Sequence, residues 1–504
     1  MEVGVVLDGE ALEVADVVGV ARRGAPVALG PEARRRLEAA RGVVEDVIAR
    51  GEVVYGVNTG FGELSRVHIS DADLATLQQN LLRSHAAGVG EPLPDEVVRG
   101  MLLLLAASQA RGHSGVRPVV TERVVDLLNR GVTPVVPARG SLGASGDLAP
   151  LAHIGLVLIG EGEATVDGER LPGRAALERA GLSPITLAAK EGLAIVNGTH
   201  LMAAVGALAI HDAHVLVESA EVAAAMSLEA LRGTDVPFDA RIQAVRRQAG
   251  QIETAAHMRA LLAGSAIIPS HRTDDPRIQD PYTLRCIPQV IGAVRDTVAH
   301  CTRIVEAELA AVTDNPLCFP EEDVVLSGGN FHGQPIALAL DILAIALAEL
   351  AAFGERRTYL LLDDREPHRD RLPAFLAHEP GLNSGYMLAQ YTAAALVAEN
   401  AVLATPAGLH SVPTSAGMED FVSMGATAAT KLRTVLRNAE HVVAIELLCA
   451  AEGVEYRRPL RAGTGVEEAL RRVRALVPPM ERDRSLHPDI AALTVALHEG
   501  QFAL

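Results

Sequence analysis

Residues 140–151 read Gly-Ser-Leu-Gly-Ala-Ser-Gly-Asp-Leu-Ala-Pro-Leu and lead into an apolar run that continues to Ile159. A glycine-rich polar turn before an apolar segment is typical of the start of a buried helix, and Pro150 is tolerated in its first turn. We therefore expect a helix from Leu148 to Ile159. Its first residues are the part of the chain that most needs a chemical explanation.

Four other apolar segments begin in the same way, after a short polar cluster. The clusters are Asn197-Gly198-Thr199, Gln279-Asp280-Pro281, Asn330-Phe331-His332 and Met418-Glu419-Asp420. Helix N-termini carry unpaired N–H groups and a positive dipole end, so five converging starts would form one electropositive site for a carboxylate or a developing anion. Each cluster, taken alone, is more typical of an ordinary helix cap.

The rest of the chain predicts a mainly α fold. Helix signals such as Pro31 before an apolar-periodic stretch that stops at Gly51 predominate, whereas strand signals are confined to the first ten residues and an Asp167-Gly168 hairpin. We expect a long central helical bundle with a smaller N-terminal domain and minor β-hairpins. A soft boundary divides 1–111, which carries Tyr55 and His85, from 112–504, which carries Ala144-Ser145-Gly146.

Composition excludes several classes of function. The 504 residues include 45 Lys and Arg against 63 Asp and Glu, a net charge of −18, so we expect no nucleic-acid partner. Lys190 and Lys431 are the only lysines, which disfavours Schiff-base chemistry. The four cysteines are scattered, and the N-terminus has no export signal, so we expect a cytoplasmic protein.

The long apolar runs are expected to be core helices. The run from Pro335 to Phe353 carries Asp341 and Glu349, and such charges argue against a membrane span. His211 and His214 stand three residues apart, yet the pattern lacks a third close ligand, so we expect no metal.

Two common interpretations of the 140–148 turn fail. A hydrolase nucleophile elbow requires Gly where Asp147 stands, and a phosphate-binding loop requires a Gly-Lys-Ser/Thr ending that is absent.

The turn resembles the prosthetic-group motif of the aromatic amino-acid ammonia-lyase family, and in particular its histidine-acting members. The resemblance extends over most of the chain. It includes residues 55–62 (Tyr-Gly-Val-Asn-Thr-Gly-Phe-Gly), 83–88 (Arg-Ser-His-Ala-Ala-Gly), 191–199 (Glu-Gly-Leu-Ala-Ile-Val-Asn-Gly-Thr), 279–285 (Gln-Asp-Pro-Tyr-Thr-Leu-Arg), 313–317 (Thr-Asp-Asn-Pro-Leu) and 329–333 (Gly-Asn-Phe-His-Gly).

The resemblance implies that Ala144-Ser145-Gly146 cyclises to methylidene-imidazolone. The Gly146 amide nitrogen attacks the Ala144 carbonyl, and water is lost, including the Ser145 hydroxyl. The residue types suit this step, because Gly146 permits a compressed backbone, Ala144 leaves its carbonyl uncrowded and Ser145 supplies the leaving hydroxyl. No added cofactor is expected.

The implied reaction is elimination of ammonia from an α-amino acid. By resemblance Tyr55 is the base, with a pKa that electropositive helix ends could lower. Arg285 is the expected clamp for the substrate carboxylate, because its planar fork matches two oxygens. Tyr282 lies three residues earlier, on the same helix face.

The remaining family positions predict how substrate is held and chosen. Asn197 and Gln279 resemble polar residues around the prosthetic group and the substrate's α-groups, and Phe331 resembles a lining residue. His85 and Glu419 are expected to face the side chain. A carboxylate suits an imidazole better than an apolar wall does, so histidine is the expected substrate and urocanate the product.

Alternatives stay open from sequence. Met418 and Phe421 stand where histidine-acting members usually have Gln and His. A lyase or 2,3-aminomutase acting on tyrosine or phenylalanine would use the same electrophile, and a non-catalytic helical scaffold would retain only the fold. A homotetramer is expected, because the site residues lie on long apolar helices and the family's sites combine several subunits.

Overall fold

A computed structural model describes residues 4–60, 62, 66–273, 275, 277–363 and 372–504, so Phe61 of the 55–62 motif lies outside the described residues. The chain forms two compact units. Unit 1 comprises Met1–His211, Thr302–Asp341 and Pro406–Thr430, and unit 2 comprises Asp212–Cys301, Ile342–Thr405 and Lys431–Leu504. No boundary between these units falls at residue 111. The expected division into domains 1–111 and 112–504 stays a prediction.

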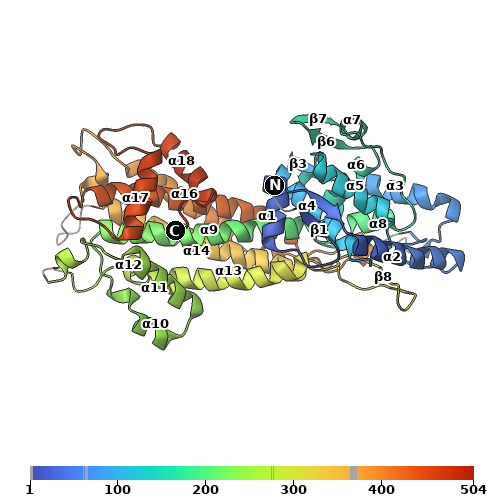
Figure 1. The fold of residues 1–504 in the computed structure, drawn as a ribbon, viewed down its shortest axis with the longest axis horizontal. Helices are drawn as coiled ribbons and strands as arrows, with labels where there is room; N and C mark the ends of the chain where they lie inside the picture. The colour runs from blue at the N-terminus through green and yellow to red at the C-terminus, as the bar shows by residue number, and fades with distance from the viewer. Residues whose placement is uncertain (1–3, 61, 63–65, 274, 276, 364–371) are drawn as a thin grey trace. The chain divides into compact units, whose positions relative to one another are not determined.

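Helices make up most of the described chain (Figure 1). They are α1 (Val14–Arg23), α2 (Pro31–Ala49), α3 (Leu74–His85), α4 (Asp95–Ala110), α5 (Pro118–Asn129), α6 (Leu148–Leu158), α7 (Gly173–Arg179), α8 (Glu191–Val196), α9 (His200–Ala230), α10 (Ala240–Arg246), α11 (Ala249–Leu261), α12 (Tyr282–Arg285), α13 (Ile287–Leu309), α14 (Gln334–Leu362), α15 (Met387–Leu403), α16 (Gly425–Glu455), α17 (Thr464–Leu476) and α18 (His487–His498).

The strands form small sheets in unit 1. Parallel β1 (Val5–Leu7) and β2 (Val27–Leu29) make one, and antiparallel pairs join β3 (Val89–Pro92) to β5 (Pro137–Arg139) and β8 (Leu317–Phe319) to β9 (Val324–Leu326). A three-stranded sheet has the order β4 (Thr133–Pro134), β6 (Glu163–Val166), β7 (Glu169–Pro172).

The sequence-based expectation of a mainly helical fold with minor strands is confirmed. Pro31 opens α2, which ends just before Gly51 as predicted. The predicted Asp-Gly hairpin joins β6 to β7, and both turn residues adopt the left-handed backbone that such a turn requires, with φ of 50° at Asp167 and 79° at Gly168.

In unit 1, α4 forms the centre of the N-terminal core. Its residues from Met101 to Ala110 are all buried, so the helix is apolar nearly all round. It packs against α1 and α5, and Figure 1 shows these helices grouped together. Helix α6 packs against α3 and α8, which places the 140–147 turn against the elements that carry His85 and Asn197.

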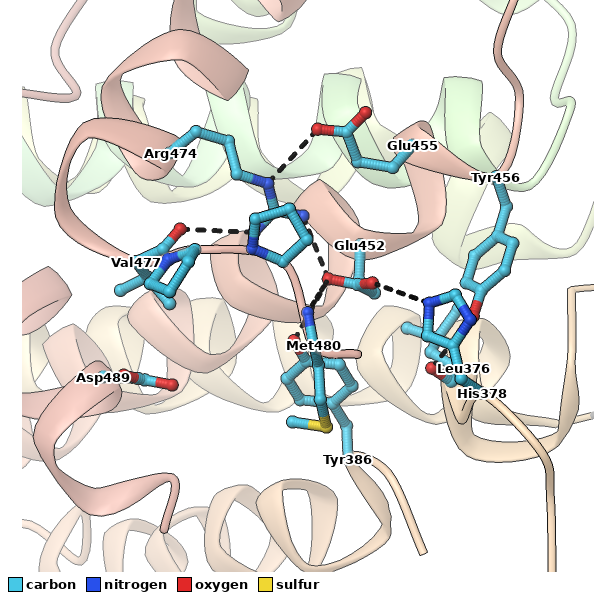
Figure 2. Close-up of polar contacts among 12 residues, drawn as sticks. Leu376, His378, Tyr386, Glu452, Glu455, Tyr456, Arg474, Val477, Met480 and Asp489 are labelled. Atoms are coloured by element: carbon cyan, nitrogen blue, oxygen red, sulfur yellow. Dashed lines mark hydrogen bonds and ion pairs between the residues drawn. The ribbon is translucent and has the colours of Figure 1, made fainter. Parts of the chain in front are cut away.

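In unit 2, the buried carboxylate of Glu452 on α16 joins several segments (Figure 2). Its Oε2 accepts hydrogen bonds from the Tyr386 hydroxyl at 3.2 Å, Arg474 Nη2 at 3.0 Å and the Met480 backbone N–H at 3.3 Å. Burial raises the pKa of Tyr386, so this phenol stays a neutral donor. One carboxylate thus fixes α17 and two irregular segments to α16.

Three described helical segments are long and apolar enough, by length and composition, to cross a membrane: His200–Ala230, Gln334–Leu362 and Met387–Leu409. The expectation that Asp341 and Glu349 make the Pro335–Phe353 run too polar for a membrane span is therefore wrong by that measure. The most apolar stretches of the first two segments are nevertheless 83% and 67% buried inside the protein, which supports the interpretation as core helices. The third is only 17% buried.

Candidate active site

Four of the five polar clusters meet at one cavity in unit 1. The cavity has a volume of about 620 Å³ and is lined by Ser145 before α6, Asn197 before α9, Phe331 before α14 and Glu419 before α16. The predicted convergence is correct for these clusters. The fifth cluster, Gln279-Asp280-Pro281, belongs to unit 2.

The cavity gathers most of the predicted site residues in a single chain. Those that line it are Tyr55, His85, Ala144, Ser145, Asn197, Phe331 and Glu419. Gln279 and Arg285 instead line a separate cavity of about 770 Å³ in unit 2. Tyr282 is on the same short helix as Arg285 and is 70% exposed.

A buried carboxylate fastens the 140–147 turn to the start of α9. Asp147 Oδ2 accepts the backbone N–H groups of Leu201 at 2.9 Å and Met202 at 3.1 Å, while Oδ1 accepts the Ser141 hydroxyl at 3.0 Å. Burial raises the pKa of Asp147 to about 7, although these hydrogen bonds act in the opposite direction. The carboxylate occupies the positive end of α9, where an anion is favoured.

The backbone of the turn lies directly against the residues before α9. Gly146 pairs with Gly198 as an isolated parallel bridge, and the Asp147 N–H donates to the Gly198 carbonyl at 2.7 Å. Gly146 has φ of 74°, and a Cβ built on it would stand 2.1 Å from the Gly198 oxygen. Only glycine fits this position, for both conformational and steric reasons.

Ser145 faces the cavity and is held by Glu419. The Ser145 hydroxyl donates to Glu419 Oε1 at 3.1 Å, and the Thr414 hydroxyl donates to Glu419 Oε2 at 2.8 Å. A second contact holds the same turn, because the Ser423 hydroxyl donates a hydrogen bond to the Gly143 carbonyl at 3.2 Å. The segment before α16 therefore positions both the carboxylate and the turn.

Tyr55 does not have the lowered pKa that the sequence suggested. Burial raises its pKa and the nearby charge of Glu419 raises it further, against a smaller lowering by a hydrogen bond with the Gly62 backbone. The expectation of a lowered pKa is wrong for the single chain, because burial has the largest effect and raises the pKa, and the charge of Glu419 raises it as well.

His85 is neutral at ordinary pH. Burial lowers its pKa, while the Glu419 charge opposes that shift. Its Nδ1 lies 3.0 Å from the Ser84 hydroxyl. On the other side of the cavity, Phe421 stacks on His332 with ring centroids 6.2 Å apart, so the departure from the family pattern at Phe421 adds an aromatic wall.

Asn197 connects the cavity to a buried ion pair. Its Nδ2 donates to Asp314 Oδ1 at 3.3 Å and to the Asn315 carbonyl at 3.1 Å. Asp314 Oδ2 in turn accepts from Lys190 Nζ at 2.7 Å, and both of these charged side chains are almost completely buried. Within the described residues, Asn197 Oδ1 is buried without a hydrogen-bond partner.

In unit 2, the predicted sharing of one helix face by Tyr282 and Arg285 is correct. The Arg285 guanidinium lies over the Tyr282 ring, 4.7 Å from its centroid. Arg285 Nε is buried with no hydrogen-bond partner in the described part of the chain. The guanidinium therefore retains donor capacity toward its cavity.

The chain matches the family model described as aromatic amino acid lyase over residues 12–475. It belongs to the aromatic amino acid lyase family. The histidine ammonia-lyase of Symbiobacterium thermophilum is 53% identical over 493 residues, which cover 98% of this chain and 96% of that protein.

Solved structures of this lyase family superpose over the full chain. Histidine ammonia-lyase from Trypanosoma cruzi matches with a TM-score of 0.91 at 41% identity, covering 99% of this chain and 94% of that one. Tyrosine aminomutase from Streptomyces globisporus matches with a TM-score of 0.93 at 38% identity, covering 99% and 98%. The same lyase fold therefore occurs in proteins named for different reactions.

Sequence reasoning missed several residues that organise this lyase site. Asp147, Thr414, Ser423 and the Lys190–Asp314 pair had no assigned role, although Asp147 and Asp314 stood inside quoted motifs. Glu191 and Asp314 are charged residues inside the stretches 191–199 and 313–317, but their burial, which marks them as important, is visible only in the structure. Among the described residues, no group of three or more His, Cys, Asp or Glu side chains is placed to hold a metal ion.

Gly146→Ala is expected to destabilise the lyase far more than Gly168→Ala. Both substitutions place a side chain on left-handed backbone, which costs about 1–2 kcal/mol. Only the first also drives a Cβ into backbone, because nothing lies within 4 Å of the Cβ position at Gly168. Thermal unfolding of the two variants checks this, and equal losses would contradict the close Gly146–Gly198 contact.

Proposed function

We propose that this lyase catalyses the non-oxidative elimination of ammonia from L-histidine to give urocanate, at the cavity lined by Ser145 and Glu419. The observation that carries the proposal is the placement of His85 and Glu419 in one cavity with Ala144-Ser145. Relatives about half identical over nearly the full chain bear the name histidine ammonia-lyase.

The residues of the turn fit a methylidene-imidazolone formed from Ala144-Ser145-Gly146. Gly146 supplies a left-handed backbone without a side chain, close against Gly198, and the Ser145 hydroxyl that must leave as water lies in the cavity beside Glu419. Asp147 and Ser423 would hold the group from either side. When formed, the group supplies an electrophile that makes the amine of the substrate a leaving group.

The chain's own residues account for recognition of an imidazole. Glu419 is an acceptor at the cavity wall, and its Oε1 becomes available once the Ser145 hydroxyl has left. His85 remains neutral because burial lowers its pKa, so it adds no charge that would repel an imidazolium. Phe331 and Phe421 provide the apolar surface for the ring. The side-chain pocket therefore suits a ring with two nitrogen atoms.

Tyr55 is the proposed acceptor of the β-proton. It must act as phenolate, and within one chain burial and Glu419 both raise its pKa. A cation close to the cavity would reverse this shift, because opposite charge favours the ionised phenol. We propose that Arg285 of a second subunit supplies this charge and also binds the substrate carboxylate.

A homo-oligomer, most simply a tetramer, follows from the same proposal. Arg285 and Gln279 line a cavity of unit 2 whereas Ser145 lines one of unit 1. Apolar residues on α15 are also exposed, with Leu388 at 52%, Tyr391 at 60% and Val402 at 74%. Exposed apolar side chains on one helix provide a surface that another subunit can cover. We propose that these surfaces meet in the assembly, which works in the cytoplasm without a membrane or nucleic-acid partner.

An aminomutase remains the second candidate. The tyrosine aminomutase fold matches this chain as well as the histidine ammonia-lyase fold does. The two reactions share amine removal and differ in whether the amine returns to the β-carbon. Analysis of products from histidine, tyrosine and phenylalanine in parallel distinguishes them, since only the lyase releases ammonia in proportion to substrate consumed.

Ser145→Ala is expected to leave a folded protein with severely reduced activity. The β-hydroxyl that must leave is absent, whereas side-chain volume hardly changes. Borohydride, which reduces an electrophilic methylidene, should inactivate the wild type in the same way. Ammonia release from histidine measures both effects, and Ser183→Ala, which removes an exposed hydroxyl outside the cavity, serves as the control. Full activity after either treatment would contradict the prosthetic group.

Glu419→Gln is expected to lower histidine turnover by about one to two decades, because a hydrogen bond to a charged group contributes about 1.5–3 kcal/mol. The matched control Glu321→Gln removes an exposed carboxylate outside the cavity and should leave kcat/KM unchanged. Steady-state kinetics with histidine check the pair. Unchanged turnover in Glu419→Gln would show that the side-chain assignment is wrong.

Coexpressed Ser145→Ala and Arg285→Met chains are expected to regain activity that neither has alone. If each site takes Ser145 and Arg285 from different subunits, random mixing in equal amounts leaves about a quarter of the sites with both native residues. The control pair is Ser145→Ala with Tyr55→Phe, whose altered residues line one cavity, so no recovery is expected. Recovery in the control pair but not in the Ser145→Ala and Arg285→Met pair would contradict the proposal that each site takes these residues from different subunits.

A further inference from the structure

The buried ion pair of Lys190 and Asp314 contacts the cavity residue Asn197, and the proposed reaction gives this pair no role. Lys190, one of only two lysines in the chain, has a side chain that is 0% exposed, and its partner Asp314 is 2% exposed. Charged groups are removed from water at a high cost, so a fully buried lysine indicates a specific requirement at that place.

The pair is attached to both ends of one short helix. Lys190 precedes α8 in a left-handed conformation with φ of 69°, and Asn197 follows the same helix. Asp314 binds Lys190 Nζ through Oδ2 at 2.7 Å and Asn197 Nδ2 through Oδ1 at 3.3 Å. A single carboxylate thus connects the residue before α8 with the cavity residue after it.

The start of α8 is held independently. The buried Glu191 carboxylate accepts from Arg117 Nε at 2.7 Å and Nη2 at 2.7 Å, and from the Ala188 backbone N–H at 2.7 Å. Planar, two-point contacts of this kind are geometrically strict. The frame from which Lys190 reaches Asp314 is therefore rigid.

The hydrogen-bond acceptors near Asn197 determine the orientation of its side-chain amide. Both groups near its nitrogen, Asp314 Oδ1 and the Asn315 carbonyl, are acceptors, so the NH₂ group must point toward them. The oxygen consequently points the other way. It is buried, has no partner in the described part of the chain, and belongs to a residue that lines the Ser145 cavity.

We propose that Lys190 and Asp314 are positioning residues that hold the Asn197 carbonyl oxygen toward the cavity, where it accepts a hydrogen bond from the ammonium group of the bound amino acid. The inference rests on the proposed function and deepens it. A carboxylate suits this task because it has no donor to offer, so it cannot present a hydrogen to the Asn197 amide. The Lys190 ammonium contacts that carboxylate at 2.7 Å and balances its charge where both are buried.

The hydrogen bonds of Asp314 predict the effect of replacing its carboxylate with a neutral amide. In Asp314→Asn, the new amide has a single oxygen, and the charged Lys190 takes it because charge-assisted hydrogen bonds are the stronger ones. The new NH₂ group then faces the NH₂ group of Asn197. The Asn197 NH₂ group then keeps one acceptor, the Asn315 carbonyl, and faces a donor where Asp314 Oδ1 stood, so the Asn197 oxygen is no longer held toward the cavity.

Binding measurements in a Ser145→Ala background, where no turnover occurs, test this. L-histidine carries the α-ammonium, whereas urocanate lacks it. Asp314→Asn should raise the Kd of histidine about tenfold or more and change that of urocanate by less than about twofold. Adding Asn197→Ala should abolish the effect of Asp314→Asn. Isothermal titration calorimetry gives all the constants, and the melting temperature of each variant is recorded alongside.

The double variant Lys190→Met/Asp314→Asn provides the decisive comparison with Asp314→Asn alone. Without the ammonium, the amide at 314 can turn its oxygen toward Asn197 and the Asn315 N–H, so histidine binding should return to that of the Ser145→Ala parent. This variant has no unpaired buried charge and carries the test if Asp314→Asn alone does not fold. Equal weakening of histidine and urocanate, or no recovery in the double variant, would overturn the inference while leaving the proposed function intact. A parent that binds neither ligand would contradict both.

Discussion

The buried carboxylate of Asp147 is the contact on which the rest of the site depends. It accepts the first free N–H groups of α9 and the Ser141 hydroxyl, while its own backbone N–H bonds to Gly198. One anion thereby satisfies donors that would otherwise be buried without partners and closes the 140–147 turn onto the helix.

The positions of the reactive groups follow from that closure. Once the turn lies against Gly198, Gly146 has no room for a side chain and Ser145 is directed toward Glu419. Asn197 leads into the same Gly198, and the Lys190–Asp314 pair decides which face of its amide meets the cavity. The site is therefore a set of helix starts held together by buried carboxylates.

Sequence predicted the helical fold and most of the cavity, because helix starts and glycine-rich turns are local patterns. Four of five polar clusters converge as expected, and α2 and the β6–β7 hairpin occur where proline and glycine placed them. The environment of Tyr55 could not be predicted, because its pKa depends on burial and on Glu419, a residue distant in sequence. The roles of Asp147 and Asp314 likewise depend on tertiary partners. Arg285 lies outside the Ser145 cavity, since a single chain holds only part of the proposed site.

The intact mass of the Asp147→Ala protein tests the central claim most directly. Formation of the group from Ala144-Ser145-Gly146 expels the Ala144 carbonyl oxygen as one water and the Ser145 hydroxyl as a second, so the wild-type chain should weigh less than its sequence requires by two waters. If Asp147 closes the turn onto α9, the folded Asp147→Ala chain should retain the full sequence mass, with circular dichroism reporting unchanged helix content. A folded Asp147→Ala chain with the same mass deficit as the wild type would contradict the account.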